Sequence, residues 1–269
     1  MTNSRDIKLH QGKTSVLVSV PHSGTGLPEV LHEQMTAEAR QLPDTDWFVD
    51  RLYNWVTELD VSFIVAPWSR YVIDLNRPPD DQPLYDQKTN SLLTGLVPIN
   101  TFSGHAIYRQ GSEIHGSEIQ RRIEAYWEPY HHALNAELAR IKNTHGHAVL
   151  FDAHSIRQEQ PLLFDGKLPD LNLGSNSGQS AAAGLIAVAR DAMLSSQYSL
   201  VVDGRFKGGY ITRQYGNPEE SVHALQLEMA QSVYMQEDPP CYREDLASSI
   251  RPTLQKLIES LMDWKPDDS

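Results

Sequence analysis

The sequence lacks several features that define whole classes of protein. Its 269 residues include one cysteine, Cys241, which excludes an internal disulfide framework and is typical of a reducing compartment. No stretch approaches the run of about 18 apolar residues that a membrane-spanning helix needs. Residues 1–6 are polar and lack the apolar core of a signal peptide, so we expect a cytoplasmic protein.

Positive charge is also scarce. The chain has 23 Lys and Arg residues against 35 Asp and Glu residues, which gives a formal net charge of −12. This balance argues against nucleic acids and anionic membranes as partners. A small anionic substrate would be repelled at long range, so its binding would need arginines close to the site.

Several catalytic signatures are missing as well. There is no Gly-x-x-x-x-Gly-Lys phosphate loop and no dinucleotide fingerprint. The absence of a His-Glu-x-x-His helix excludes a thermolysin-like metalloprotease. Ser23 and Ser155 follow histidines, but no Gly-x-Ser-x-Gly elbow surrounds them, which argues against a serine hydrolase.

The most informative stretch is 148–155, an apolar run that ends in Asp152 and is followed by His154 and a polar loop. An uninterrupted apolar run of this length predicts a buried strand of an α/β sheet. Ligands bind beyond the carboxyl ends of such strands, so an acid and an imidazole there indicate a site. For a histidine that stood alone, a core imidazole bonded to a neighbour would be an equal alternative.

Three other predicted strands also end in polar residues. Residues 14–20 lead into His22, residues 70–76 carry Asp74 and Asn76 near their end and lead into Arg77, and residues 222–229 carry Glu228 near their end. A fifth strand is predicted over 61–66. Carboxyl ends of parallel strands meet at one sheet edge, so we expect these polar side chains to lie together.

Helical spacing predicts helices over 47–56, 112–143, 181–195 and 242–264, with Pro129 bending or splitting the second. Asp44 or Thr45 is the expected N-cap of the first helix, and Asp46 lies in its first turn. Residues 80–111 and the Gly/Pro-rich segment after 157 read as long functional loops. The length and this order of elements predict one α/β domain that spans residues 1–269.

Zinc catalysis typically uses three His or carboxylate ligands with a further carboxylate as general base. Residues of these types are His22, Asp46, His154 and Glu228. Asn76 and Arg77 are suited to form a pair of hydrogen-bond donors for a carboxylate or an oxyanion. A buried ion pair between Asp74 and Arg77 is the alternative, and both could hold together. Arg205, Lys207 and Arg213 lie among glycines, which suggests an anion-binding loop or, alternatively, a solvated turn.

Five motifs in this order resemble the N-formylglutamate amidohydrolase family over residues 14 to 236. They are 20–24 (VPHSG), 44–47 (DTDW), 74–78 (DLNRP), 152–155 (DAHS) and 205–213 (RFKGGYITR). The resemblance implies hydrolysis of N-formyl-L-glutamate to formate and glutamate in histidine breakdown. It also implies a three-layer α/β fold similar to zinc carboxypeptidases and aspartoacylases, with a mixed, mostly parallel sheet and helices on both faces.

The resemblance leads to a specific hypothesis for the site. His22, Asp46 and His154 hold Zn²⁺ or another divalent metal, Glu228 removes the proton of the attacking water, and Arg77 stabilises the oxyanion. Asn76, Arg77, Arg205 and Arg213 hold the substrate carboxylates. The aspartoacylases carry Glu three residues after the first metal-binding His. This chain has Thr25 at that position, so Asp46 is assigned as the acidic ligand. A hydrolase of another N-acyl amino acid or peptide and a non-catalytic metal-binding protein are the alternatives.

Overall fold

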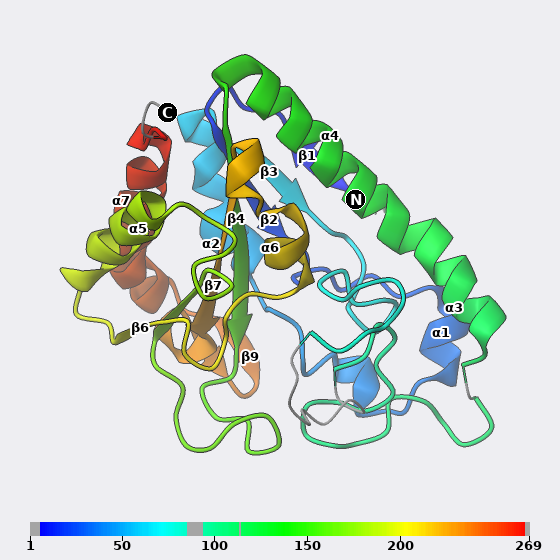
Figure 1. Cartoon of the computed structure of the whole chain (residues 1–269). Coiled ribbons are helices and arrows are strands. Elements are labelled where there is room, and N and C mark those ends of the chain that lie inside the picture. Colours follow the sequence, from blue (N-terminus) through cyan, green and yellow to red (C-terminus); the bar gives the residue numbers. More distant parts are fainter. Residues whose placement is uncertain (1–5, 85–93, 113, 267–269) are drawn as a thin grey trace.

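The computed structural model describes residues 6–84, 94–112 and 114–266 (Figure 1). Nine strands are assigned in these residues: β1 (Lys8–His10), β2 (Val16–Val20), β3 (Ser62–Val65), β4 (Ala148–Ile156), β5 (Leu171–Gly174), β6 (Leu200–Val202), β7 (Val222–Ala230), β8 (Met235–Glu237) and β9 (Pro240–Tyr242). The first seven form one sheet in the order β1-β3-β2-β4-β7-β5-β6, and β8 pairs with β9. The central strands β3, β2, β4 and β7 are parallel, whereas β1 and β5 are antiparallel to their neighbours β3 and β7.

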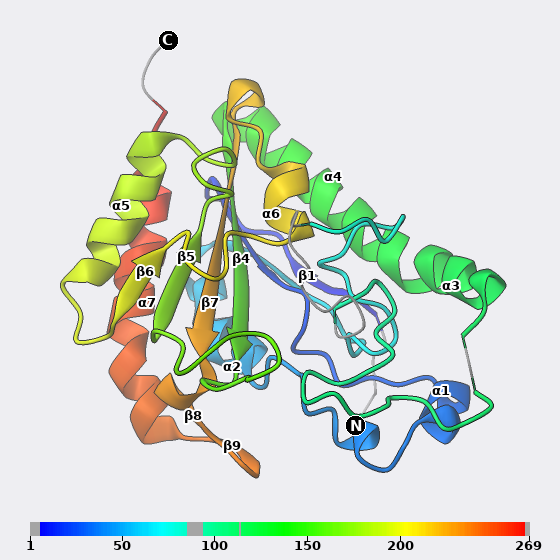
Figure 2. The ribbon, with the colours of Figure 1, turned by 60° about the horizontal axis from the view of Figure 1, so that its bottom comes forward.

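Helices cover both faces of this sheet (Figures 1 and 2). The α-helices are α1 (Glu29–Gln34), α2 (Val49–Tyr53), α3 (Gly116–Arg122), α4 (Glu128–His145), α5 (Ala183–Leu194), α6 (Tyr210–Tyr215) and α7 (Glu244–Asp263). Side chains of α2, α5 and α7 pack in one apolar core, and those of α4 and α6 pack in a second core on the opposite face. The expected three-layer α/β fold with a mixed, mostly parallel sheet is confirmed.

The two faces of β4 and β7 differ in chemistry. Because successive side chains of a strand point to opposite faces, Val149, Phe151 and Ala153 enter the core beneath α5 and α7. Leu150 enters the core beneath α4 on the other face, and the same face continues with Asp152 and His154. The α4 side therefore changes from apolar to polar toward the carboxyl ends of the strands.

Most of the predicted elements are present. The runs at 14–20, 61–66 and 222–229 form β2, β3 and β7, and the two C-terminal helical patterns form α5 and α7. The run at 148–152 forms β4, but this strand continues to Ile156, so Asp152 and His154 lie within it. The described parts of the 80–111 segment contain turns and isolated bridges, as expected; residues 85–93 lie outside the described part.

The predicted strand over 70–76 is wrong, because these residues form turns. Tyr71, Val72 and Ile73 are buried, which produces the apolar pattern of a strand. Their backbone groups bond elsewhere: the amide of Val72 donates to Ser69, and the amide of Asp74 donates to Leu96. Buried turn residues thus give the same run of apolar residues in the sequence as a paired strand.

Several smaller expectations also fail. The helix after Asp46 begins at Val49 with Phe48 in the left-handed region at its N-cap, so neither Asp44 nor Thr45 caps it. The segment after 157 contains β5. By contrast, the expected split of the long helical pattern near Pro129 is confirmed: a π-helical turn over Ile123–Trp127 ends two residues before this proline.

A tight approach of two backbones fixes the loop that follows β2. A Cβ atom on Gly24 would lie 2.5 Å from the carbonyl carbon of Pro67, so any other residue would push the two segments apart. Among the described residues, no helix is long and apolar enough to cross a membrane.

Candidate metal and active site

The register between β4 and β7 brings four polar side chains together. Asp152 pairs with Gln226, and His154 pairs with Glu228, on neighbouring parallel strands. Each of these four residues is buried. Paired residues of adjacent strands project to the same face, so the carboxyl-terminal part of the sheet presents one polar cluster toward the α4 side.

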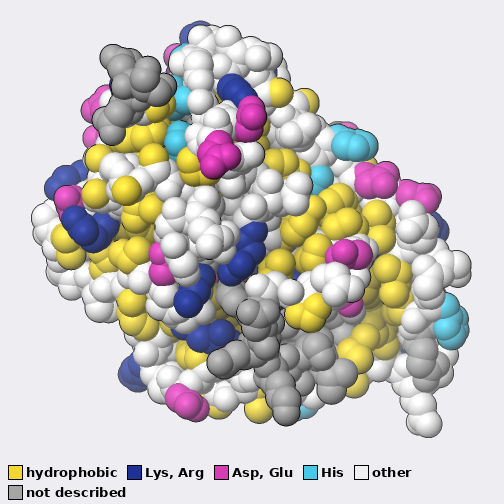
Figure 3. All heavy atoms as spheres, viewed as in Figure 1, with side chains coloured by type: hydrophobic (Ala, Val, Ile, Leu, Met, Phe, Trp, Pro, Cys, Tyr) yellow, Lys and Arg dark blue, Asp and Glu magenta, His cyan; other side chains and the backbone are white. Residues whose placement is uncertain are grey.

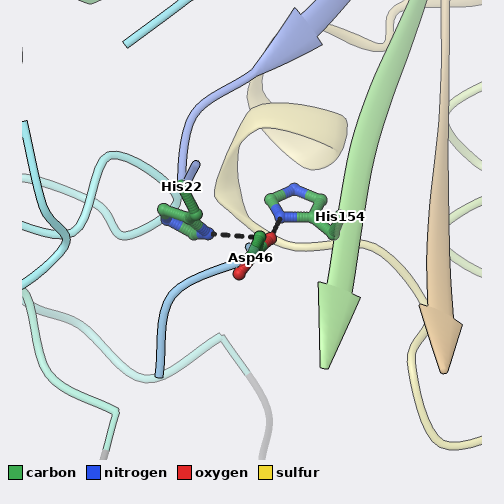
Figure 4. A group of neighbouring side chains, drawn as sticks. All are labelled: His22, Asp46 and His154. Carbon is green, nitrogen blue, oxygen red and sulfur yellow. Dashed lines mark hydrogen bonds and ion pairs between the residues drawn. The ribbon is translucent and has the colours of Figure 1, made fainter. Parts of the chain in front are cut away.

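Three buried side chains from separate segments meet at this cluster (Figure 4). His22 follows β2, Asp46 precedes α2, and His154 lies on β4. The Nδ1 atom of His154 is 3.0 Å from Asp46 Oδ2, and Nδ1 of His22 is 3.8 Å from the same oxygen. One potential ligand atom from each residue lies within 4.8 Å of the others.

The backbone positions Asp46 for this contact. Its amide donates to the carbonyl of His22, and its Oδ2 accepts a hydrogen bond from the amide of Ser155 at 3.2 Å. Gln231 donates to the carbonyl of Thr45, and Tyr234 donates to the carbonyl of Trp47 at 2.6 Å. The segment before α2 is thus tied to the end of β2, to β4 and to the residues that follow β7.

The outer nitrogen of each imidazole faces its own carboxylate. His22 Nε2 lies 2.8 Å from Asp74 Oδ1, and His154 Nε2 lies 2.7 Å from Asp152 Oδ2. An ionised carboxylate only accepts hydrogen bonds, so both Nε2 atoms are donors. The Nδ1 atom of each ring is directed toward Asp46. Carboxylates that orient imidazoles in this way are characteristic of metal-binding histidines.

Arg70 was not anticipated as a site residue. Its guanidinium contacts His22 Nδ1 and donates to Asp46 Oδ1 at 3.1 Å, and its side chain is 10% exposed. It is therefore a nearly buried cation inside an acidic cluster. A single arginine in a turn forms no motif in the sequence. The strand wrongly predicted over 70–76 also gave no reason to place Arg70 at the site.

The charges set the protonation of the three central residues. Burial lowers the pKa of His22, and Arg70 lowers it further, so this imidazole is neutral. Burial opposes ionisation of Asp46, but Arg70 and His154 outweigh it and lower its pKa. For His154, burial is likewise outweighed by Asp152 and Asp46, which raise its pKa well above the ordinary value.

These residues fit a divalent metal. Two imidazoles and a carboxylate match the donor types that zinc and related ions bind, and the ligand atoms lie close enough to share one ion. His154 Nδ1 faces a carboxylate, and a metal ion that bound this nitrogen would displace its proton, so binding would release protons. The expectation of a group of residues that could hold a metal is confirmed. The identity of the metal is part of the proposed function.

Glu228 lies beside this group on β7. It is 7% exposed, and burial raises its pKa to about 8; His154 and Arg70 lower it, whereas Asp46 raises it. A buried carboxyl group with a pKa near neutrality is suited to take up and return a proton.

A small cavity opens onto the cluster. Its volume of about 110 Å³ is enough for several water molecules or one small ligand. Polar lining residues include His22, Asp46, Arg70, Arg77, His154, Arg205 and Glu228. Apolar lining comes from Phe102, Ile156, Leu163 and Phe206.

The predicted substrate residues differ in position. Arg77 and Arg205 line the cavity, and both Nε and Nη2 of Arg205 donate to the carbonyl of Leu163. Arg213 is not among the described residues that line it, and its Nε donates to the carbonyl of Gly208. In Figure 3, Lys and Arg side chains gather near the middle of one face of this acidic protein.

Asn76 lines the cavity but is engaged by the protein. Its Nδ2 lies 3.4 Å from Asp152 Oδ2, and its Oδ1 accepts a bond from the amide of Ile211 at 2.7 Å. A Cβ atom on Gly209 would lie 2.4 Å from Asn76 Nδ2, which explains the glycine at that position. The geometry favours a role for Asn76 in orienting the acid behind His154.

The comparisons with known proteins agree with this geometry. The family model described as N-formylglutamate amidohydrolase matches residues 14–235. The N-formylglutamate deformylase of Pseudomonas aeruginosa is 47% identical over 260 residues, and that of Pseudomonas putida is 46% identical over 263 residues. Each alignment covers 96% of both chains.

Solved structures show the same fold. The crystal structure of N-formylglutamate amidohydrolase from Ralstonia eutropha superposes with a TM-score of 0.82 at 25% identity, covering 95% of this chain and 97% of that one. A gene product of Agrobacterium tumefaciens superposes with a TM-score of 0.71 at 14% identity, covering 96% of each chain, which bears on the fold alone.

Fold and site together define a class: α/β enzymes with a His–Asp–His group, suited to a metal, at the carboxyl edge of a mostly parallel sheet. Within this class, the chain belongs to the N-formylglutamate amidohydrolase family. The family expected from the five motifs is thereby confirmed.

Proposed function

We propose that this protein is a metal-dependent deformylase that hydrolyses N-formyl-L-glutamate to formate and L-glutamate. Its relatives from two Pseudomonas species carry this activity in their names, and their similarity extends over 96% of the chain. The observation that carries the metal dependence is the pair of imidazoles, each bonded through Nε2 to a carboxylate and directed through Nδ1 toward Asp46.

His22, Asp46 and His154 would hold the metal, which we propose to be zinc. When bound, it would supply a Lewis acid that polarises water and the formyl carbonyl. Glu228 would remove a proton from the attacking water and return it to the leaving amine as the carbon–nitrogen bond breaks. Its burial and its pKa of about 8 support this exchange.

Two cations would recognise the anionic substrate. Arg77 and Arg205 line the cavity and are proposed to meet the glutamate carboxylates. Arg77 would also stabilise the oxyanion as the water adds to the formyl carbon. Asn76 would keep Asp152 oriented behind His154 rather than contact the substrate.

The wider setting belongs to the same proposal. We expect one catalytic domain over residues 1–269, a cytoplasmic location and a role in histidine degradation. These expectations rest on the sequence and its family.

Formate release from N-formyl-L-glutamate is the direct test. We expect the metal-loaded protein to be active, the chelator-treated protein to be inactive, and zinc to restore turnover. His154→Ala should lose metal and activity together, whereas His32→Ala, a change at an exposed histidine of α1, should lose neither. Full activity in a protein stripped of metal would overturn the metal dependence.

The substrate is tested with a panel of acyl donors. N-acetylglutamate and an N-formyl amino acid without a side-chain carboxylate are the informative comparisons. Faster turnover of either would assign the protein to another N-acyl substrate, and absence of turnover with metal bound would contradict an enzymatic role.

A further inference from the structure

The segment from Asp74 to Arg77 carries three side chains of the site but belongs to no strand. Asp74 orients His22, Asn76 bonds to Asp152, and Arg77 lines the cavity. Asp74 also accepts the amide of Asn76 at 2.8 Å, which makes a local turn. Its position must therefore be fixed by contacts from other elements rather than by a ladder of strand hydrogen bonds.

Two aromatic side chains hold the carbonyl groups of this segment. Trp127 Nε1 donates to the carbonyl of Arg77 at 3.0 Å, and His131 Nε2 donates to the carbonyl of Leu75 at 2.9 Å. The two residues are four positions apart on one helical path, so they lie on the same side of it. Their rings stack with centroids 3.7 Å apart, which fixes both orientations together.

The contact with Leu75 fixes the tautomer of His131. A carbonyl oxygen only accepts, so the ring proton is on Nε2, and Nδ1 lies 2.9 Å from the hydroxyl of Tyr215, from α6. Burial lowers the pKa of His131 to about 4, which keeps the ring neutral at physiological pH. His131 is 4% exposed, so its ring is shielded from solvent.

We infer that Trp127 and His131 are positioning residues of the active site, which act through the backbone of Leu75 and Arg77 on groups that touch the metal ligands and the substrate. This inference rests on the proposed function, because it assigns those groups their tasks. The two residues act on different parts of the segment, and this difference makes their roles separable.

His131 holds the carbonyl between Asp74 and Asn76, which act on His22 and on the Asp152–His154 pair. Loss of its donor should weaken metal binding, since partners that orient ligating imidazoles typically change affinity by about 10- to 100-fold. Trp127 holds the carbonyl of Arg77, so loss of its donor should raise KM more than it lowers kcat.

The decisive comparison for His131 is between His131→Gln and His131→Met. The two replacements have similar length and volume, but only glutamine keeps a donor close to the position of Nε2. We expect His131→Met to bind zinc about tenfold more weakly than His131→Gln in competition with a chelator. Equal affinities would overturn the role of His131, and this readout requires no substrate.

Trp127→Phe keeps the stacked ring and removes the N–H group. We expect KM for N-formylglutamate to rise by about tenfold, near the upper limit for one hydrogen bond, with kcat changed less than about twofold. Trp55→Phe is the matched control, because Trp55 Nε1 donates to the carbonyl of Leu52 away from the cavity. Unchanged KM in Trp127→Phe, or an equal rise in Trp55→Phe, would overturn the inference.

The two proposals fail in different ways. An inactive metal-loaded wild type would contradict the proposed function and leave the zinc affinities of the His131 variants as the test of positioning. An active wild type whose variants match it in KM and zinc affinity would contradict the positioning role alone.

Discussion

His154 and Glu228 are register partners on the neighbouring parallel strands β4 and β7. The imidazole that would bind the metal and the carboxylate that would move the proton are therefore placed by one set of backbone hydrogen bonds. Glu228 is close enough for its pKa to respond to His154, yet it is not part of the His–Asp–His group. Glu228 can therefore act as the proton acceptor beside the metal ligands without being one of them.

Glu228→Gln keeps the shape of the side chain and removes the proton acceptor. We expect kcat to fall by about 10²–10⁴-fold, the usual loss for a general base. Metal content should stay at the wild-type level, because Glu228 is not a proposed ligand. Formate release and metal analysis on the same preparation test both statements. If turnover stayed near normal, another acid such as Asp74 or Asp152 would have to be the base.

The raised pKa of Glu228 predicts a pH dependence of stability in the metal-free protein. Its folded-state pKa of about 8 exceeds the ordinary value of 4.5, so the folded state binds this proton more tightly than the unfolded chain. The stabilisation is complete below the lower value and is lost as the pH rises through the higher one.

Urea unfolding of metal-free wild type and Glu228→Gln measures this effect. From about pH 5 to about pH 9, the free energy of unfolding of wild type should decrease relative to that of the variant. A constant difference between the two proteins would mean that the carboxyl group is not raised in pKa.

Asp74→Asn tests the carboxylate behind His22. The amide keeps the size of the side chain but loses the charge that orients the imidazole. We expect metal affinity to fall by about 10- to 100-fold in competition with a chelator. Glu137→Gln is the control, since it removes a buried carboxylate that bonds to Ser62 and Arg140. A similar loss of metal in both variants would point to general destabilisation.

Arg205→Ala and Arg213→Ala separate the two cations of one motif. Arg205 lines the cavity, so its loss should lower kcat/KM for N-formylglutamate by about 10- to 100-fold, as expected for a charged hydrogen bond. Arg213→Ala should have a smaller effect, because Arg213 is not among the described residues that line the cavity. Equal losses would support the contact that the sequence predicted for Arg213.

The sequence predicts the residues that motifs and strand patterns mark. His22, Asp46 and His154 were assigned together, and the structure brings them within reach of one ion. β4 is buried along its whole length and β7 along nearly all of it, and the apolar residues that this burial requires are adjacent in the sequence, so both strands could be predicted. Their roles as ligands remain a prediction.

Roles that depend on contacts across the chain could not be predicted in this way. The role of Arg70 and the pairing of Asp74 with His22 depend on contacts with His22, 48 and 52 positions away. The apolar pattern around them reflects burial under other loops, which a single sequence does not distinguish from strand pairing. Likewise, nothing local to His131 indicates that its ring is covered by Trp127 and Tyr215.

The π-helical turn at Ile123–Trp127 has a consequence for helical phase. Arg122, on α3, is 2% exposed and donates to the carbonyl of Val72 at 3.0 Å, while His131, on α4, donates to the carbonyl of Leu75. Each residue of an α-helix advances the angle by about 100°. Deleting one residue from the turn would rotate α3 against α4 by roughly this angle and release one of the two carbonyls. The π-helical turn thus sets the angle between α3 and α4 so that Arg122 and His131 can both bond to carbonyl groups of the same irregular segment.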